Sequence, residues 1–237
     1  MLYIETGKVA SVPKPTELVA TGYADLDKLL CGGLCSSSAV VLTSPSCNER
    51  DSLIKSFLKT GADKDEVTFY LTTSARAAKA LAEEFQSGFY LFVCNPQADA
   101  IDGSFPNVFR LKGVENLTEI SIALTSAIHK LDASQKGPRR ACIEIVSDVL
   151  LQHHAVQTRK WLTALTTELT SAGFTILAVV DPQMHPPEEL HAILGLFDGE
   201  INIYEKETEK GSEKFLKIKR MSNQKYLENE LLLTKAG

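Results

Sequence analysis

The chain has 237 residues, with 25 lysines and arginines against 30 aspartates and glutamates, so its formal net charge is −5. Apolar residues make up 44% and charged residues 23%, as is usual for a globular protein. A chain of this length can bury the core of one large α/β domain or two small ones. Its acidic balance argues against a dedicated duplex-DNA binder, whose affinity depends on a basic surface.

The sequence contains no segment that we expect to enter a membrane. Its longest uncharged apolar runs, such as Phe174–Val180, are far shorter than the ~20 residues that span a bilayer. No basic segment followed by an apolar one opens the sequence, so we expect no secretory signal and a cytoplasmic location. Residues 1–16, with Pro13 and Pro15, are expected to form an N-terminal arm. No repeat or long linker follows, so residues 17–237 are expected to form a single domain.

Strand-like and helix-like stretches alternate through most of the sequence. The predicted strands are apolar runs bounded by turn residues: Ser38–Thr43, Glu66–Leu71, Phe89–Val93, Ala141–Val146 and Phe174–Val180. Apolar residues at helical spacing fall between or after these runs and include Leu53, Ala78, Ile120, Trp161 and Leu190. Asn116 and Glu119 have the spacing of a capping box, and Pro187 suits the first turn of a helix.

The C-terminal part changes character, with short strands predicted at Glu200–Tyr204, Phe215–Lys219 and Asn229–Thr234. Alternating strands and helices predict an α/β fold with a mostly parallel central sheet and helices on both faces. The last strands are expected to be antiparallel and to lie at one edge of this sheet.

The five cysteines are scattered along the chain and odd in number. Cys31 and Cys35 flank a Gly-Gly-Leu segment, but no second pair with zinc-ligand spacing follows. Cys94 and Cys142 lie in apolar runs and are interpreted as small buried hydrophobic residues. We therefore expect reduced thiols and no metal site.

Several segments occur in an order typical of one protein superfamily. They are TGYADLDKLLCGGL at Thr21–Leu34, LTT at Leu71–Thr73, RACIEIVSDVLL at Arg140–Leu151, FDGEI at Phe197–Ile201 and KIKRM at Lys217–Met221. Together they resemble the KaiC-like ATPases of the RecA superfamily along nearly the whole chain. The segment DPQMH at Asp181–His185 resembles an archaeal subgroup, which indicates an archaeal origin. The resemblance implies a P-loop NTPase fold whose Walker B strand lies within Arg140–Leu151.

The phosphate-binding loop is the place where the sequence departs from this family. The family pattern is G-x-x-x-x-G-K-[ST], and the corresponding residues here are Ser44, Pro45, Ser46, Cys47, Asn48, Glu49, Arg50 and Asp51. Both glycines, which allow backbone N–H groups to surround phosphates, are replaced. Arg50 keeps the positive charge of the lysine but not its shape, and Asp51 replaces the hydroxyl that binds magnesium.

The charges of the altered loop also disfavour a polyphosphate. Asn48, Glu49 and Asp51 lie at a predicted helix N-terminus and can cap it themselves. A triphosphate would meet two carboxylates, and one like-charge contact near 4 Å costs about 4 kcal/mol at an effective dielectric constant of 20. Arg50 could offset one of them. We predict a loop that holds no ATP and a protein without a cofactor; the alternative is weak Mg-ATP binding in a distorted loop.

Two further catalytic positions of the family are altered as well. The catalytic glutamate follows the second strand, where this chain has Thr72–Arg76 without a carboxylate, so no group is predicted to orient an attacking water. Glu144 occupies the position of the Walker B aspartate. Asp148, four residues later, could contact a partner or ligand, although capping of Val149–Leu151 is the simpler interpretation. Hydrolysis is predicted to be absent.

Other polar clusters allow a functional and a structural interpretation. Asp181 and His185 follow the fifth strand, together with Glu188, Glu189 and His191. Ligands of open α/β sheets bind near the carboxyl ends of strands, so this strand-end loop is well placed. A solvated loop whose acidic residues serve the following helix is the simpler interpretation of the cluster. His153 and His154 are expected in a polar turn before a helix, where adjacent side chains diverge and share no metal.

Two basic clusters lie at Lys136–Arg140 and Lys214–Arg220. Neither is interleaved with aromatic residues that would stack on bases, so nucleic-acid binding is not expected. We interpret the first cluster as a solvated loop and the second as the outer face of an edge strand.

These observations predict a non-catalytic KaiC-like module that regulates or scaffolds other proteins. The expected partner is a protein, either a related RecA-superfamily ATPase or a second copy of this chain. Two alternatives remain open. One is a divergent ATPase that uses Arg50, Asp51 and Glu144 in place of lysine, serine and aspartate. The other is a DNA-repair accessory of the RecA-paralog type.

Overall fold

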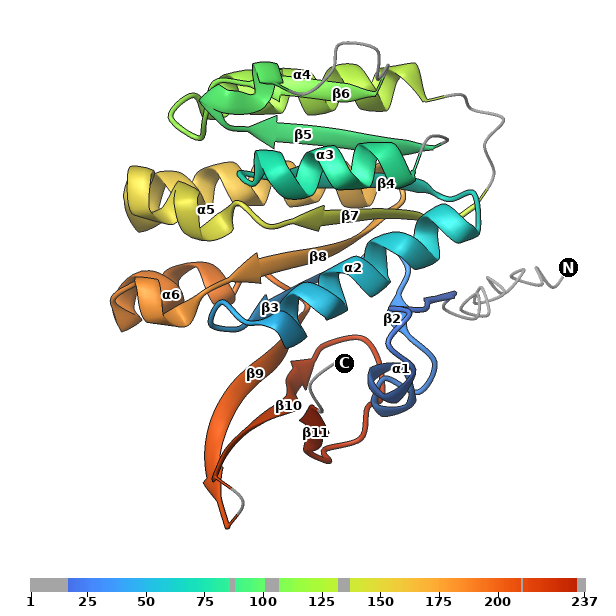
Figure 1. The fold of residues 1–237 in the computed structure, drawn as a ribbon, viewed down its shortest axis with the longest axis vertical. Helices are drawn as coiled ribbons and strands as arrows, with labels where there is room; N and C mark the ends of the chain where they lie inside the picture. The colour runs from blue at the N-terminus through green and yellow to red at the C-terminus, as the bar shows by residue number, and fades with distance from the viewer. Residues whose placement is uncertain (1–16, 86–87, 101–106, 132–136, 210, 234–237) are drawn as a thin grey trace, which may run out of the picture.

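A computed structural model describes residues 17–85, 88–100, 107–131, 137–209 and 211–233, so the predicted arm at residues 1–16 lies outside the described residues. Within the described residues, nine strands form one large sheet in the order β11-β10-β9-β3-β8-β7-β4-β5-β6, and β1 and β2 form a small antiparallel sheet. Neighbouring strands from β9 to β6 are parallel, and β10 and β11 extend one edge in antiparallel pairing (Figure 1). This arrangement confirms the predicted α/β fold.

The central strands β3, β4, β5, β7 and β8 are short and mostly buried, as expected for a sheet covered on both faces, whereas β10 is mostly exposed or partly exposed. The strands are β1 (Leu18–Val19), β2 (Leu34–Cys35), β3 (Ala39–Thr43), β4 (Val67–Thr72), β5 (Phe89–Cys94), β6 (Val108–Leu111), β7 (Arg139–Ile143), β8 (Phe174–Val180), β9 (Gly199–Thr208), β10 (Gly211–Met221) and β11 (Leu231–Leu233). All residues of β3, β4 and β8 are buried.

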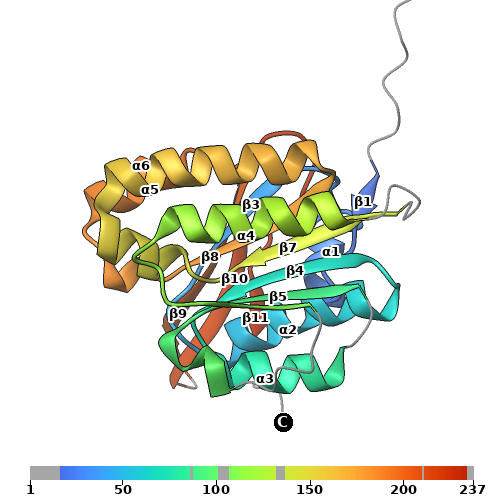
Figure 2. The ribbon, with the colours of Figure 1, turned by 90° about the horizontal axis from the view of Figure 1, so that it is seen from above.

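The helices cover both faces of the sheet. They are α1 (Ala24–Leu29), α2 (Asn48–Asp63), α3 (Ala75–Glu84), α4 (Leu117–Lys130), α5 (Val146–Ser171) and α6 (Pro187–Leu194), with short 3₁₀ turns η1 (Pro96–Ala100) and η2 (Pro182–Met184). Figure 2 shows α4, α5 and α6 on one face and α2 and α3 on the other. Within the described parts of the chain, no helix is both long and apolar enough to cross a bilayer.

Each face of the sheet has its own apolar core. One core packs α4, α5 and α6 onto the sheet, and the other packs α1, α2 and α3 onto the opposite face. Phe69 on β4 is fully buried in the first core, and its ring lies 4.5–5.2 Å from those of Tyr90, Phe92 and Phe174. At the start of α4, Asn116 accepts a hydrogen bond from the backbone N–H of Glu119 at 3.1 Å, which confirms the predicted N-cap.

One local prediction around the fourth strand is wrong. The strand expected at Ala141–Val146 is β7 and ends at Ile143, because Val146 already begins α5. The predicted turn at His153 and His154 is confirmed as a kink within α5. His154 has a φ of 55° and a ψ of 173°, which are not helical, and a second helical stretch follows it.

Arg140 corrects the interpretation of the first basic cluster. Lys136 lies outside the described residues, but Arg140 is part of β7 and its side chain is fully buried. Its Nε donates to Glu66 Oε2 at 2.7 Å, and Nη1 donates to the carbonyl oxygens of Ala20 and Phe57. Burial of a charged guanidinium costs folding free energy unless the group is paired and hydrogen-bonded in this way. Arg140 thus joins β7 to α2, to Glu66 directly before β4, and to the segment that follows β1.

Gln224 connects the two ends of the described chain. Its side-chain oxygen accepts from the backbone N–H of Cys35 at 2.8 Å, and its Nε2 donates to the carbonyl oxygens of Leu30 and Gly33. Gly33 has a φ of +139°, and a Cβ there would lie 2.4 Å from the Val19 carbonyl oxygen. Only glycine therefore allows β1 and β2 to approach as closely as they do.

Candidate functional site

The loop between β3 and α2 forms the predicted strand–loop–helix turn at the carboxyl edge of the sheet. Two of its backbone N–H groups already have protein partners: Ser44 donates to the Val180 carbonyl at 3.0 Å, and Ser46 donates to Asp181 Oδ2 at 3.1 Å. The Ser44 hydroxyl donates to the carbonyl oxygen of Pro45 at 2.8 Å. The structure therefore brings the strand-end residue Asp181 to the loop. Its carboxylate accepts a hydrogen bond from a backbone N–H group that could otherwise donate to a bound anion.

The first turn of α2 carries a carboxylate that faces inward. Cys47 is the N-cap residue and makes no side-chain capping bond, whereas Glu49 is buried and lies 3.3 Å from the Lys214 ammonium on β10. Burial opposes ionisation of Glu49, but a hydrogen bond from its own backbone N–H and the Lys214 charge outweigh burial and lower its pKa. Glu49 is thus an ionised carboxylate at the helix N-terminus.

Lys214 also corrects the interpretation of the second basic cluster. Its strand, β10, is not the outermost strand at this point, because β11 pairs with it from Lys214 to Leu216. Lys214 points to the loop, and Lys219 pairs with Glu200 at 2.7 Å. Sequence reasoning missed this contact because Lys214 and Glu49 are far apart in the chain and no local pattern links them.

Arg50 is held by three side chains next to the loop. Its Nη1 donates to Ser46 Oγ at 3.0 Å, and its Nε and Nη2 donate to Asp51 Oδ1 at 3.0 and 2.9 Å. Nη2 also lies 3.9 Å from Glu144 Oε1. The Arg50 side chain is only 14% exposed. Asp51, which the sequence suggested as a helix cap, binds Arg50 instead.

Glu144 lies directly after β7, at the position predicted for the Walker B carboxylate. Its Oε2 accepts hydrogen bonds from the Tyr70 hydroxyl and from Thr72 Oγ1, the latter at 2.9 Å. Burial, and then the Glu144 charge, raise the pKa of Tyr70, so the phenol stays neutral and donates. Tyr70 and Thr72 were missed because they appear in the sequence as ordinary strand residues.

The end of β4 presents hydroxyl groups where the sequence analysis looked for a catalytic glutamate. Ser74 caps α3 by accepting from the Ala77 N–H at 3.2 Å, and Thr73 Oγ1 donates to Asp148 at 3.4 Å. Asp148 lies in the first turn of α5, whose N-cap is Ile145, so it does not begin a helix of its own.

His185 follows η2 beside this region and is buried, with 8% of its surface exposed. Both of its ring nitrogens are enclosed and lack a hydrogen-bond partner. Burial lowers the pKa of His185, and Glu189, Asp181 and Asp148 act against that effect. No group of three or more histidine, cysteine or acidic side chains in the described residues is arranged to hold a metal ion.

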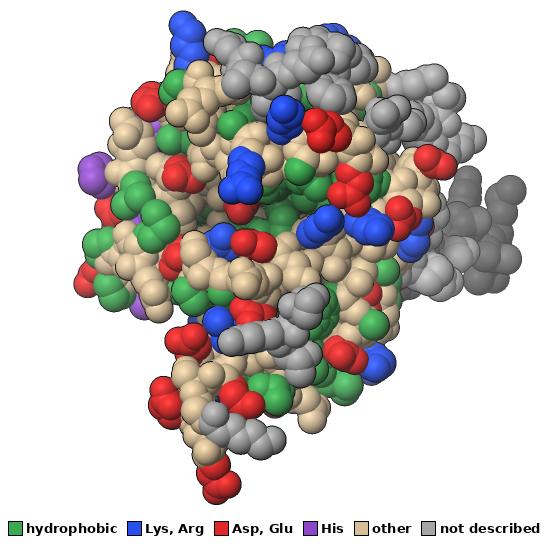
Figure 3. Space-filling view, viewed as in Figure 1, with side chains coloured by type: hydrophobic (Ala, Val, Ile, Leu, Met, Phe, Trp, Pro, Cys, Tyr) green, Lys and Arg blue, Asp and Glu red, His purple; other side chains and the backbone are tan. Residues whose placement is uncertain are grey.

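A recess of about 400 Å³ lies between α2 and α3 beside Arg50. Its lining combines apolar side chains with charged ones: Arg50, Asp51, Ile54, Lys55, Leu58, Tyr70, Ser74, Ala77, Ala80, Leu81, Glu84 and Glu144. Figure 3 shows this face of the molecule hollowed near its centre, with hydrophobic side chains in the hollow and charged side chains around it.

This strand order and this loop define a RecA-like fold, and comparison with solved structures agrees. The chain is similar to the KaiC-like protein PH0186 from the hyperthermophilic archaeon Pyrococcus horikoshii OT3, with a TM-score of 0.68, 17% sequence identity, and coverage of 94% of this chain and 96% of that one. The predicted KaiC-like, RecA-superfamily fold is confirmed. The chain belongs to a family of unknown function, DUF7504, whose model matches residues 28–203. No curated protein matches it.

Proposed function

We propose that this protein is a non-catalytic KaiC-like module that holds no ATP and acts in the cytoplasm as a regulatory or scaffolding protein-interaction domain. The observation that carries the proposal is the position of Arg50, whose guanidinium is bound by Ser46 and Asp51 and faces Glu144. The side chain that replaces the family's phosphate-binding lysine is thus engaged within the chain.

The charges around the loop support the proposal. Three carboxylates, those of Glu49, Asp51 and Glu144, face the two cations Arg50 and Lys214, and a fourth, Asp181, accepts from the Ser46 amide of the loop. A triphosphate entering this region would add negative charge where carboxylates already outnumber cations. A single uncompensated contact near 4 Å costs about 4 kcal/mol at an effective dielectric constant of 20, which corresponds to roughly a thousandfold in affinity.

The altered loop also offers fewer donors than a phosphate site needs. Phosphate loops bind their ligand through backbone N–H groups that point at it. The Ser46 N–H group already donates to the Asp181 carboxylate, and the Ser44 N–H group donates to the Val180 carbonyl oxygen on the neighbouring strand β8. A divergent ATPase would have to release Asp51 from Arg50 before Asp51 could bind magnesium. These contacts favour a partner protein, such as a related ATPase or a second copy of this chain, over a nucleotide.

The test is thermal unfolding of the full chain with and without millimolar Mg-ATP. We expect no change in Tm, whereas a ligand at a hundred times its Kd would stabilise the protein by about 2.7 kcal/mol. A second variant restores the family pattern with Ser44→Gly, Glu49→Gly, Arg50→Lys and Asp51→Thr, and we expect it to gain a response to Mg-ATP. Stabilisation of the unaltered chain, with a Kd in the low micromolar range, would overturn the proposal and favour the divergent ATPase.

A further inference from the structure

The outer side of α4 carries a shallow groove, here called the α4 groove, whose lining comes from this helix alone. It has a volume of about 570 Å³, and its lining residues run from Thr118 to Lys130. Figure 2 looks onto this side of the molecule, with α4 in front of the sheet. Ile122 lies in the groove, near the middle of the helix, and is 65% exposed. An exposed apolar side chain within a groove favours an interaction surface.

Two hydroxyl groups of the α4 groove are already hydrogen-bonded within the chain. Ser121 Oγ donates to the Leu117 carbonyl oxygen at 3.0 Å and accepts from Trp161 Nε1 at 3.3 Å. Thr125 Oγ1 donates to Glu168 Oε1 at 2.6 Å. These hydroxyls need no external partner, so covering them costs little free energy. Their side chains are also short, which lets a second helix approach the backbone of α4 closely.

The charged residues of α4 make the helix complementary to an inverted copy of itself. Glu119 lies in its first turn, and His129 and Lys130 lie in its last. Glu119 and Lys130 are about three whole turns apart, so both lie on the same side of the helix. A two-fold axis across the middle of α4 therefore brings Glu119 of one copy beside Lys130 of the other, once at each end. A parallel arrangement would instead place like charges together.

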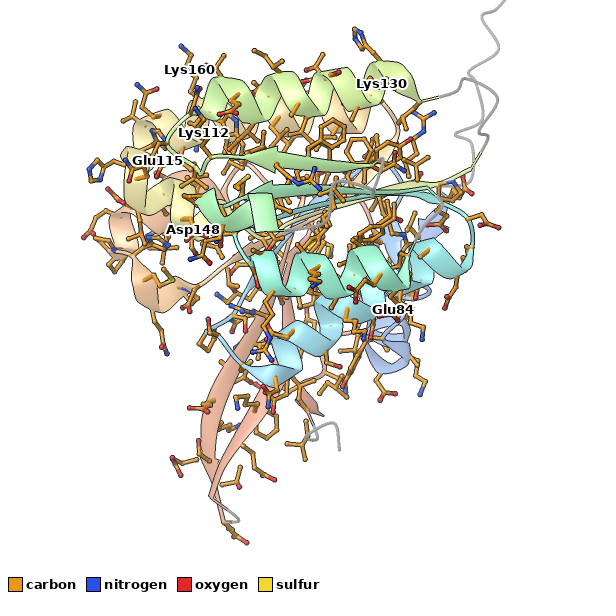
Figure 4. The ribbon with its side chains drawn as sticks, turned by 45° about the horizontal axis from the view of Figure 1, so that its top comes forward. Glu84, Lys112, Glu115, Lys130, Asp148 and Lys160 are labelled. Carbon is orange, nitrogen blue, oxygen red and sulfur yellow. The ribbon has the colours of Figure 1, made fainter. Side chains whose placement is uncertain are left out.

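The charges of Glu119 and Lys130 are available for such a contact. Within the described residues neither forms an ion pair, and the Lys130 ammonium lies 6.0 Å from the centre of the Phe109 ring. Figure 4 shows Glu115, just before α4, and Lys130 at opposite ends of the helix. Lysines also lie near the Glu115 end in that view, so the fit depends on the two charged residues of the helix itself and not on the net charge of each end.

We propose that two copies of this chain associate through α4 in an antiparallel, two-fold symmetric arrangement. The Ile122 side chains pack near the axis, and a Glu119–Lys130 ion pair joins the copies at each end. This inference rests on the proposed role as a protein-interaction domain and commits that role to a second copy of the chain. A helix of 14 residues is only about 21 Å long, so the contact is smaller than a standard interface. We therefore expect a reversible dimer with a Kd of about 10–100 µM.

The experiment is sedimentation equilibrium of the full chain at low ionic strength, at concentrations on both sides of that Kd. A reducing agent is present because Cys31 is exposed and could otherwise form disulfides between copies. We expect monomers and dimers and no larger species, because a two-fold contact is closed. A chain that stays monomeric at all concentrations would overturn the proposal, as would growth into larger assemblies.

Two matched variants test where the copies meet. Ile122→Glu brings two carboxylates together near the axis and should raise the Kd at least about a hundredfold. Val156→Glu makes the same kind of change on α5, at a side chain that is 82% exposed and outside the α4 groove, and should leave the Kd unchanged. Both side chains are exposed, so both variants should keep the Tm of the unaltered monomer. An equal effect of the two variants, or no effect of Ile122→Glu, would overturn the proposal.

Charge reversals test the antiparallel arrangement. Glu119→Lys and Lys130→Glu each replace two ion pairs by two like-charge contacts, so each variant alone should raise the Kd at least about fivefold. An equimolar mixture of the two should associate as the unaltered chain does, because every contact then joins opposite charges. An unchanged Kd for the single variants, or a mixture that associates no better than they do, would overturn the proposal. None of these outcomes depends on whether the phosphate loop binds Mg-ATP, so the two proposals fail separately.

Discussion

The buried ion pair between Arg140 and Glu66 makes a quantitative prediction about stability. Arg140 is 0% and Glu66 7% exposed, and burial lowers the pKa of Arg140 while the Glu66 carboxylate raises it. Glu66→Gln keeps the size of the side chain but leaves the guanidinium in the core without a counter-charge. Breaking one partner of a buried pair costs about 3–5 kcal/mol.

The remaining contacts of Arg140 place the expected cost at the lower end of that range. Its hydrogen bonds to the Ala20 and Phe57 carbonyls persist, as does its position 4.8 Å from the centre of the Phe57 ring. We expect Glu66→Gln to lose about 3 kcal/mol of unfolding free energy. For a chain of this size that corresponds to a decrease in Tm of about 6–12 °C.

Urea unfolding followed by circular dichroism measures the effect, and two further variants make it interpretable. Glu84→Gln removes the exposed pair with Lys55, at 3.3 Å, and should cost less than about 1 kcal/mol. The double variant Glu66→Leu/Arg140→Met removes both buried charges and should be more stable than Glu66→Gln. The reasoning is refuted if Glu66→Gln costs no more than Glu84→Gln, or if the double variant is the least stable of the three.

Substitutions at three other positions have defined outcomes. The pKa of Glu49 is lowered in the folded state, so its ionised form stabilises the protein above the unfolded pKa, and that contribution disappears as pH falls through the folded pKa. Glu49→Gln should therefore be less stable than the unaltered chain in urea at neutral pH, and a gap that persists in strong acid would contradict this. Asn116→Ala removes the N-cap of α4 and should cost about 1 kcal/mol, whereas Asn116→Asp should cost little. Phe69→Ala opens a cavity among three aromatic rings and should cost about 3–5 kcal/mol by calorimetry, and a smaller loss would indicate collapse of the core.

The fold could be predicted because its signals are local and repeated. Runs such as Phe174–Val180 and the apolar spacing after Asn116 identify strands and helices from a few neighbouring residues. The break in α5 at His154 is local as well, and the polar pair His153 and His154 indicated it. The burial of Arg140 could not be predicted in this way, because its charge suggested an exposed side chain and only the distant Glu66 makes its burial possible.

The candidate site was predicted in position but not in its contacts. The chain order of strands fixes which loops meet at the carboxyl edge, so the loop at Ser44–Asp51 and Glu144 could be placed in advance. The pairing of Glu49 with Lys214 and of Ser46 with Asp181 depends on three-dimensional neighbours that no spacing rule links. Tyr70 likewise contacts Glu144 only because β4 lies beside β7.

The contacts of Gln224 bear on where the folding unit ends. The family match stops at residue 203. The side-chain amide of Gln224, which follows β10, nevertheless hydrogen-bonds to the backbone of Leu30, Gly33 and Cys35 near the beginning of the described chain. A protein shortened to the matched residues would lose these hydrogen bonds. It would also leave the edge of β9 that pairs with β10 without a partner strand. The segment matched by the family model is therefore shorter than the part of the chain that these contacts join, and truncation studies should retain the sequence through β11.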